Sequence, residues 1–373
     1  MNNNFDVILQ LRGMLAGKEI IDDEIFYHPE LLEIDLKRKL NKEYKTCKDE
    51  LYIELGNQDL KADETRLRIK DALDHHKEQT GNLPASIILE NIAVVTVKKK
   101  PKDKAKSLFN KVAIVTGAAG AIGYGICRRL LEEGGLVAVT DLIQEKLDQF
   151  VLEFRDEFPD QFIAVTMDVT EQVSVKHAFD QVKSRWGGID IVIINAGIAL
   201  VSSLIEMKLE DFRRLEKVNI DGTLTTLIET AKSFITQGIG GDIVLVSTKN
   251  VFSPSANFGA YSATKAGSHQ LARIASLELA QYSVRVNMVA PDGVFSGGSH
   301  KSGLWQEIGP GRMKARGLDE KGLEEYYKNR NLLKAKVTAR HVANAVMFFI
   351  THQAPTTGVT IPVDGGLPDA TPR

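Results

Sequence analysis

The sequence has little cysteine and no long apolar run. Cys47 and Cys127 are its two cysteines among 373 residues, too few for the disulfide framework of a small secreted domain, so we expect both thiols to be reduced. No apolar stretch reaches the roughly 18 residues that a membrane-spanning helix needs. The start, Met1 to Asn4, lacks the basic and apolar regions of a signal peptide. These absences predict a cytoplasmic protein that does not enter a membrane.

The chain also has little excess charge. Its formal net charge is −2 at pH 7, which gives no general reason to expect a nucleic-acid partner. One basic run, Lys98 to Lys106, contains Pro101 but no interleaved aromatic residue, so an exposed linker is favoured over a nucleic-acid site. The length supports one full domain plus a smaller one. We therefore expect a small unit (1–97), a basic linker (98–107) and a larger domain (108–373).

The N-terminal unit has mixed periodicity. Apolar residues from Leu31 to Leu40 predict one helix, and Thr65–Lys77 predicts another. Two apolar runs, Ser86–Leu89 and Ile92–Val97, predict strands. The unit is therefore expected to be a small α/β or α+β fold.

The histidines of this unit do not suit a metal. They are His28, His75 and His76, and two adjacent residues of a helix cannot both face one ion. Neither a His-x-His nor a Glu-x-x-His spacing occurs. We therefore expect solvated surface histidines and no metal site.

A strand–turn–helix pattern opens the larger domain. The apolar run Lys111–Val115 leads into small residues from Gly117 to Gly123, and a helical pattern follows. Glycine lets a backbone approach a pyrophosphate, and a helix N-terminus offers free N–H groups to phosphates. The next strand, Leu136–Thr140, ends on Asp141, an acid placed to bind ribose hydroxyls and to repel a 2′-phosphate. The pattern predicts a dinucleotide site that favours NAD over NADP; an ordinary strand-to-helix turn is the alternative.

A tyrosine and a lysine four residues apart form the second constellation. Tyr261 and Lys265 would lie on one face of a helix. A free tyrosine has a pKa of about 10, and a nearby ammonium favours the phenolate, so we expect Lys265 to lower the pKa of Tyr261. Taken alone, such a spacing is usually a surface pair, so the interpretation depends on the motifs before it.

The order of these motifs resembles the short-chain dehydrogenase/reductase family over roughly residues 108–373. The resemblance implies an α/β fold, a Rossmann-type doubly wound parallel sheet. It also implies a nicotinamide cofactor, here NAD. The expected cofactor contacts are Gly117, Gly120, Ala121, Ile122, Gly123, Asp141, Asp168, Val169, Asn195, Ala196, Gly197, Tyr261, Lys265, Pro291 and Val294.

The resemblance implies a role for each of four catalytic residues. Tyr261 would be the general acid/base on the substrate oxygen, and Thr248 would hydrogen-bond that oxygen. Lys265 would lower the tyrosine pKa and hold the nicotinamide ribose. Asn219 would keep a water in a proton relay; its alternative is a helix-interior residue with a local hydrogen bond.

Two positions depart from the family pattern. Ala121 occupies a position that is usually glycine, with Gly120 just before it, and Thr248 stands where serine is usual. Threonine keeps the hydroxyl donor, although its methyl group narrows the pocket. Ser247 is the neighbouring candidate, but strand alternation would point it to the opposite face.

The C-terminal part resembles, more narrowly, the dehydrogenase half of bifunctional rhamnulose-phosphate aldolase/short-chain dehydrogenase proteins. The segments that carry this likeness are Ser247–Asn250, Pro291–Val294, Leu323–Leu333, Ile361–Gly366 and the final Pro372-Arg373. In that family an aldolase domain comes first. Residues 1–97 are too few for an intact one, but Leu9–Leu15 and Pro84–Ala93 resemble its later segments, so the unit is interpreted as an aldolase remnant.

The stretch Phe295–Gly322 is expected to be a long substrate loop. It would be a mobile lid with Trp305 closing over the substrate, or simply a solvated loop. Lys249, Lys301 and Arg312 could meet a phosphate or a carboxylate. The candidate substrate contacts are Lys249, Asn250 and Trp305.

We predict an enzyme that transfers a hydride between NAD and a small hydroxylated substrate: a sugar, polyol, sugar phosphate or hydroxyaldehyde such as lactaldehyde. The alternative is a non-catalytic NAD-binding sensor or scaffold, because fold does not fix function. A surviving aldolase would lack both length and ligands. An outer apolar stripe on the helix Tyr261–Leu279 predicts a homotetramer, with a dimer next. Neither a nucleic-acid nor a membrane partner is expected.

Overall fold

The computed structural model describes residues 4–21, 24–38, 40, 49–55, 62–98, 106–297 and 300–368. Its largest element is a seven-stranded sheet in the order β15-β12-β11-β10-β7-β8-β9, and every neighbouring pair of strands is parallel. The strands are β7 (Val112–Val115), β8 (Leu136–Asp141), β9 (Phe162–Thr166), β10 (Ile191–Ile194), β11 (Gly241–Val246), β12 (Val284–Pro291) and β15 (Thr360–Val363).

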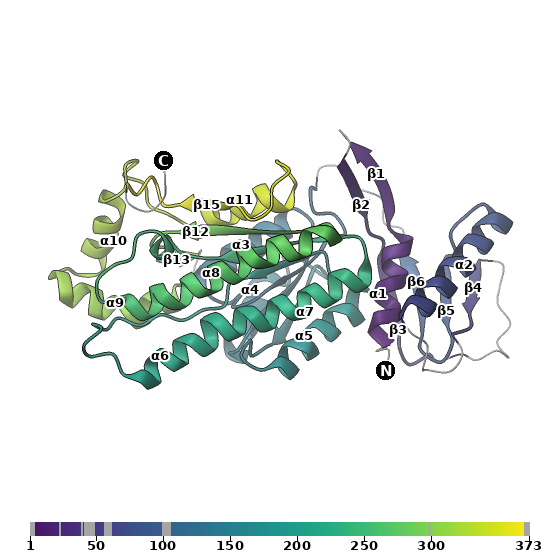
Figure 1. The fold of residues 1–373 in the computed structure, drawn as a ribbon, viewed down its shortest axis with the longest axis horizontal. Coiled ribbons are helices and arrows are strands. Elements are labelled where there is room, and N and C mark those ends of the chain that lie inside the picture. The colour runs from purple at the N-terminus through teal and green to yellow at the C-terminus, as the bar shows by residue number, and fades with distance from the viewer. Residues whose placement is uncertain are drawn as a thin grey trace.

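Helices cover both faces of this sheet (Figure 1). One face carries α3 (Ala121–Glu132), α4 (Gln144–Phe154) and α11 (Ala339–Ile350), and the other carries α5 (Gln172–Trp186), α7 (Gly222–Gln237) and α8 (Gly259–Leu279). In β7, Ala113 and Val115 pack into the first core, whereas Val112 and Ile114 pack into the second. Successive strand residues point to opposite faces, so a strand covered on both sides is apolar throughout. The predicted doubly wound Rossmann-type fold is confirmed.

The winding of the chain reverses between β7 and β10. From β7 the chain continues through β8 and β9 on one side, and then crosses to β10, β11 and β12 on the other. In open parallel sheets, ligands bind outside the carboxyl ends of the strands at such a switch point. The small-residue turn after β7 and Asn195 after β10 lie at this edge.

Residues 4–98 contain a second sheet of four strands, in the order β3-β6-β5-β4. The elements of this region are α1 (Asn4–Leu15), β1 (Gly17–Ile21), β2 (Glu24–His28), β3 (Leu31–Asp35), β4 (Glu50–Ile53), α2 (Ala62–Thr80), β5 (Ser86–Leu89) and β6 (Ala93–Lys98). The expected later helix and both strands are confirmed by α2, β5 and β6. The division of the chain at the basic segment stays a prediction, because residues 99–105 of that segment lie outside the described residues.

The helix expected from Leu31 to Leu40 is wrong, because Leu31–Asp35 is the strand β3. It pairs antiparallel with β6, and Leu32 faces the core while Glu33 and Asp35 are exposed. The apolar spacing of this short segment fits either period. The segment is a strand because the edge of β6 supplies its backbone hydrogen-bond partners.

The expectation of solvated histidines is wrong for His76, which is buried. It lies on the inner stripe of α2 with Thr65, Ile69 and Leu73, so helix packing covers it. His75 is exposed. In the described part of the chain, no group of three or more His, Cys, Asp or Glu residues is placed to hold a metal ion.

Helix α1 joins the N-terminal unit to the large sheet through a buried ion pair. Arg12 is fully buried and donates from Nη1 and Nη2 to the two carboxylate oxygens of Asp190, at 3.0 and 2.8 Å. Its Nη1 also donates to Oε1 of Gln237 at 3.2 Å, and Asp190 accepts from the backbone N of Val112 at 2.7 Å. Asp190 precedes β10 and Val112 begins β7. The unit is therefore attached at the amino ends of the strands, at the other end of the molecule from α9 and α10 (Figure 1).

Candidate active site

The turn after β7 brings two backbone segments into close contact. Gly117 has a φ of +60°, and a Cβ on it would lie 2.8 Å from Cα of Ala196. A Cβ on Gly123 would lie 2.5 Å from the carbonyl oxygen of Gly117. At Gly120 the same test meets only the Gly117 carbonyl oxygen, at 3.4 Å, which is ordinary contact. Ala121 is buried at the first position of α3. The two matching glycines are thus sterically required, and the alanine fits.

The N-terminus of α3 opens at this turn without a side-chain cap from the described residues. The uncapped first turn leaves backbone N–H groups and the positive end of the helix dipole available to an anion. This is the feature that a dinucleotide pyrophosphate needs.

Asp141 is the last residue of β8, and Asp168 follows the end of the neighbouring strand β9 by two residues. Oδ2 of Asp141 accepts from the backbone N of Ala119 at 3.1 Å, so the carboxylate lies against the small-residue turn. Oδ1 of Asp168 accepts from the backbone N and the hydroxyl of Thr170 at 2.9 and 2.8 Å. Val169, which follows, packs against Gly222 of α7 rather than into the catalytic pocket.

Thr116 was not anticipated from the sequence, although it organises the switch point. Its hydroxyl oxygen is fully buried and accepts from the backbone N of Asn195 and of Ala196, both at 2.9 Å. Nδ2 of Asn195 returns two hydrogen bonds, to the carbonyl oxygens of Thr116 and Gly117, at 2.9 Å each. These bonds tie the carboxyl end of β7 to that of β10. The sequence feature that could have identified Thr116 is its hydroxyl side chain directly before Gly117, the first glycine of the turn.

Tyr261 and Lys265 lie in α8, and both are buried. Burial raises the pKa of Tyr261 to about 12, and a hydrogen bond with the Thr248 side chain only partly opposes this. Burial lowers the pKa of Lys265 to about 8, and its Nζ donates to the Val246 carbonyl oxygen at 2.8 Å. The expected lowering of the tyrosine pKa by Lys265 is therefore not found, because desolvation dominates.

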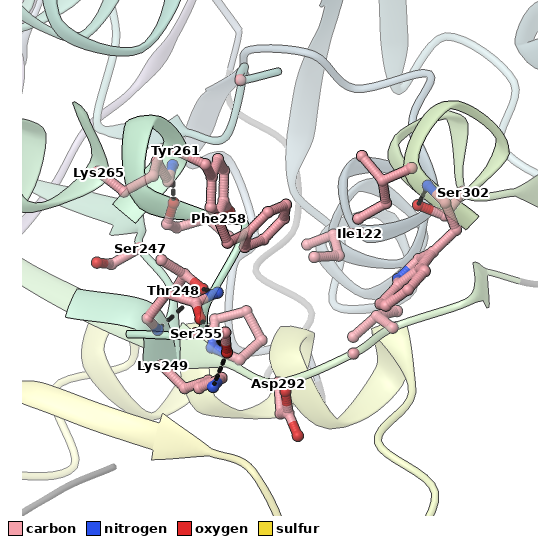
Figure 2. Close-up of a pocket in the computed structure, with 18 of the residues that line it drawn as sticks. Ile122, Ser247, Thr248, Lys249, Ser255, Phe258, Tyr261, Lys265, Asp292 and Ser302 are labelled. Carbon is pink, nitrogen blue, oxygen red and sulfur yellow. Dashed lines mark hydrogen bonds between the residues drawn. The ribbon is translucent and has the colours of Figure 1, made fainter. Parts of the chain in front are cut away.

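Thr248 and Ser247 point in opposite directions, as strand alternation predicts. The Thr248 side chain lies near the Tyr261 phenol and acts to lower its pKa, and its hydroxyl oxygen accepts from N and Nδ2 of Asn250 at 3.3 Å each. Oγ of Ser247 lies 2.9 Å from Nδ1 of His269, on the other side of the strand end (Figure 2). The structure thus brings Thr248, and not Ser247, to the tyrosine.

Asn219 lies in a π-helical turn, η1 (Lys217–Asp221), before α7. Its Nδ2 donates to the Ile198 carbonyl oxygen and to the Thr264 hydroxyl at 3.0 Å each, and its Oδ1 accepts from the Ile198 backbone N at 2.9 Å. A Cβ on Gly197 would lie 3.2 Å from Asn219 Oδ1 and 3.6 Å from Lys265 Nζ. Asn219 therefore stands beside Lys265 and positions the loop after β10.

These side chains border a cavity of about 120 Å³. Tyr261, Thr248 and Lys249 lie on one side of it, opposite Ile122 and Ser302 (Figure 2). Its lining includes these expected residues: Ile122, Asn195, Gly197, Thr248, Lys249, Asn250, Tyr261, Lys265, Pro291, Val294, Trp305 and Arg312. The sequence did not identify Phe258, Ile308, Tyr327 and Arg330 as pocket residues, since no motif marks them.

The long loop expected over Phe295–Gly322 is wrong. The segment holds the short strands β13 (Ser296–Gly297) and β14 (His300–Lys301) and the helix α9 (Gly303–Arg316), and α10 (Glu320–Asn329) begins within it. Gly309, Pro310 and Gly311 concealed the helix, yet Trp305, Ile308 and Arg312 recur at i, i+3 and i+7 and all line the cavity. Ser299 and the Lys301 side chain lie outside the described residues.

Comparison with known proteins identifies the family. The short chain dehydrogenase family model matches residues 111–307. The uncharacterized oxidoreductase YuxG of Bacillus subtilis (strain 168) is 38% identical over 267 residues, which are 70% of this chain and 38% of that protein. The (-)-isopiperitenol/(-)-carveol dehydrogenase of Mentha piperita is 31% identical over 70% of this chain and 95% of its own length.

Proteins that act on a phosphorylated polyol are also similar. The Escherichia coli (strain K12) sorbitol-6-phosphate 2-dehydrogenase is 29% identical over 69% of this chain and 98% of its own length. The crystal structure of sorbitol-6-phosphate 2-dehydrogenase SrlD from Erwinia amylovora superposes with a TM-score of 0.63 and 26% identity, over 68% of this chain and 98% of SrlD. The chain belongs to the short-chain dehydrogenase family of nicotinamide-dependent oxidoreductases.

Proposed function

We propose that this protein transfers a hydride between NAD and a small hydroxylated substrate: a polyol, a sugar, a sugar phosphate or a hydroxyaldehyde such as lactaldehyde. One observation carries the proposal. Tyr261, Thr248 and Lys265 line one cavity at the carboxyl ends of the parallel strands, and the Thr248 side chain lies near enough to the Tyr261 phenol to act on its pKa. Relatives that act on sorbitol 6-phosphate and on glucose support the substrate class.

The chain's own residues would move a proton and hold the reacting oxygen. When bound, a nicotinamide cofactor supplies the hydride donor or acceptor. The Tyr261 phenol would give a proton to the substrate oxygen in reduction and take it in oxidation, while the Thr248 hydroxyl holds that oxygen. The raised pKa of Tyr261 keeps the phenol protonated in the resting protein, as a general acid requires. Lys265 would bind the nicotinamide ribose, with Asn219 beside it as part of a proton relay.

The preference for NAD rests on Asp141 and its surroundings. Its carboxylate lies against the Ala119 backbone, where the adenosine ribose would sit, and the turn Ala118-Ala119-Gly120 brings no cation to balance a 2′-phosphate. Two negative charges at close range in a partly buried site repel by an energy on the order of a few kcal/mol. Comparable kcat/KM with NAD and NADP would contradict this.

The N-terminal unit is proposed to be the remnant of an aldolase domain fused to the dehydrogenase. The chain spans only 38% of the length of the Bacillus subtilis relative, so that relative carries further sequence outside the matched region.

A homo-oligomer, a tetramer with a dimer next, is proposed from the outer faces of α7 and α8. Leu224, Ile228 and Ile235 on α7 and Ile274 and Leu277 on α8 are exposed apolar residues. A monomeric mass at micromolar concentration in light scattering would contradict this assembly.

A cytoplasmic location is proposed from the buried free thiol of Cys127; Cys47 lies outside the described residues. None of the helices in the described ranges is long and apolar enough to cross a membrane. The proposal includes no nucleic-acid partner, consistent with the net charge of −2.

The decisive experiment measures NADH formation over a panel of polyols, aldoses, sugar phosphates and lactaldehyde, with Tyr261→Phe as the matched control. We expect turnover that Tyr261→Phe abolishes while NAD binding persists. NAD binding without turnover of any panel member would instead support an NAD-binding sensor on the same fold.

A further inference from the structure

The cavity that holds Tyr261 is bordered by more cations than carboxylates. Lys249, Arg312 and Arg330 all line it, and Asp292 is the acid among the described lining residues. Arg330 is committed to that acid, because its Nε donates to Oδ2 of Asp292 at 3.0 Å and its Nη2 bonds Oδ1. Asp292 also acts on the charge of Lys249, but no carboxylate of a described side chain pairs with Arg312.

Arg312 is the strongest sign of a missing anion. Its side chain is 4% exposed, and its guanidinium carbon lies 4.4 Å from the centre of the Phe258 ring. Its Nε is buried without a hydrogen-bond partner, and no carboxylate of a described side chain pairs with it. A buried charge is costly unless it is paired and hydrogen-bonded, so such a group indicates a ligand that completes it.

Lys249 brings a second donor to the same place. It is 5% exposed, and its Nζ donates to the Ser253 carbonyl oxygen at 3.0 Å and to the Ser255 hydroxyl at 3.1 Å. An ammonium has three N–H donors, so one remains. Burial and the neighbouring Arg330 lower its pKa to about 8, which an anion at this place would reverse.

Both cations lie beside the reacting atoms. Arg312 stacks on Phe258, whose ring centre is 4.7 Å from that of Tyr261, and Lys249 follows Thr248 directly. A cofactor pyrophosphate would bind at the turn from Gly117 to Gly123, to which neither cation belongs. One cavity, of about 120 Å³, is lined by both cations and by Tyr261.

We propose that Arg312 and Lys249 form an oxyanion subsite, so that the substrate is a small hydroxylated molecule carrying a carboxylate or a phosphate. The inference rests on the proposed dehydrogenase function. Arg312 would contact the anion from its planar guanidinium, and Lys249 would add a point charge. The subsite sets which end of the substrate meets Tyr261.

The first test measures binding without turnover. Thermal unfolding of the full-length protein, with saturating NAD, is followed in sodium phosphate and in sodium glycolate at ionic strength matched by chloride. The variants are Arg312→Gln and, as a control that removes one charge from the exposed face of the same helix, Lys314→Gln. At least one of the two anions should stabilise the wild type and Lys314→Gln but not Arg312→Gln. Equal stabilisation of all three proteins would mean an adventitious ion only and would overturn the subsite.

The second test compares substrates that differ in charge. kcat/KM is measured for sorbitol, sorbitol 6-phosphate, glycerol and glycerate. The ratio of kcat/KM for each anionic substrate to kcat/KM for its neutral counterpart should fall about 10- to 100-fold in Arg312→Gln, which is the usual effect of losing a hydrogen bond between charged groups. A fall only in the ratio of sorbitol 6-phosphate to sorbitol identifies a phosphorylated substrate. A fall only in the ratio of glycerate to glycerol identifies a hydroxy acid.

A third variant separates binding from folding. Arg312→Met keeps an unbranched side chain against Phe258 and removes the unpaired charge, so without ligand its unfolding temperature should rise. A fall would assign Arg312 to the fold and count against the subsite. Turnover of neutral substrates with no preference for anions, in the wild type, would overturn the subsite while leaving the dehydrogenase function intact. Absence of NAD binding and of all turnover would instead reject the proposed function.

Discussion

Replacing Arg12 with methionine should weaken the attachment of the N-terminal unit to the large sheet and should substantially lower the free energy of unfolding. The change removes two hydrogen bonds to Asp190, one to Gln237 and one to the Glu30 carbonyl oxygen. It leaves the Asp190 carboxylate buried with the Val112 N–H as its remaining donor from this cluster. Breaking one side of a buried ion pair costs about 3–5 kcal/mol. We expect a loss of that size in the free energy of unfolding.

The difference in unfolding free energy between the wild type and Arg12→Met should depend on pH. Burial alone would raise the pKa of Asp190, but the Arg12 guanidinium and Lys111 hold it below its ordinary value. In the wild type the carboxylate therefore stabilises the fold above the unfolded-state pKa of about 3.9. Without Arg12, burial raises that pKa, so the charged form opposes folding at neutral pH. The stability gap between wild type and Arg12→Met should narrow as pH falls from about 7 toward about 5.

Urea unfolding at both pH values measures the effect. Lys70→Met, which removes one exposed cation from α2, is the matched control and should stay within about 0.5 kcal/mol of the wild type. Arg12→Met combined with Asp190→Asn should recover part of the loss, because no uncompensated charge remains. A gap under about 1 kcal/mol at pH 7, or one that widens on acidification, would refute the reasoning.

The remaining predictions concern the active site. Tyr261→Phe should lower kcat by about 100- to 10,000-fold with NAD affinity nearly unchanged, measured by steady-state kinetics and calorimetry. The oxidative rate should rise with pH as the Tyr261 phenol ionises. If Lys265 lowers the tyrosine pKa once the cofactor is bound, Lys265→Met should move that rise to higher pH. An unchanged pH–rate profile in Lys265→Met would argue against this role for Lys265. Thr248→Ser should stay active and Thr248→Val should not; equal rates would remove the hydroxyl from the mechanism. Asp141→Ala should raise NADP turnover relative to NAD without abolishing activity, and an unchanged ratio would argue against its role.

The parts that the sequence predicted well are those set by local chemistry. A buried parallel strand is apolar throughout, so β7 could be recognised from a few residues. Gly117 and Gly123 are required because a Cβ there would meet backbone atoms, and such glycines can be recognised in a sequence. Strand alternation correctly separated Thr248 from Ser247, since it depends only on the backbone.

The parts that failed depend on distant partners. Whether Leu31–Asp35 was a helix or a strand was decided by pairing with β6, more than sixty residues later. Helix α9 was concealed by its internal glycines and proline, and it forms against a pocket wall that lies elsewhere in the sequence. The raised pKa of Tyr261 follows from its burial, which no spacing of residues reveals.

The ion pair beneath α1 has a consequence for the order in which the chain can fold during synthesis. Arg12 leaves the ribosome before both of its partners, because Asp190 and Gln237 follow 178 and 225 residues later. At about 5–20 residues per second, the arginine waits roughly 10 to 45 s for its partners. During that interval the partners of Arg12 on the large sheet do not yet exist, so the α1 face that carries it stays uncovered until α7 has been synthesised.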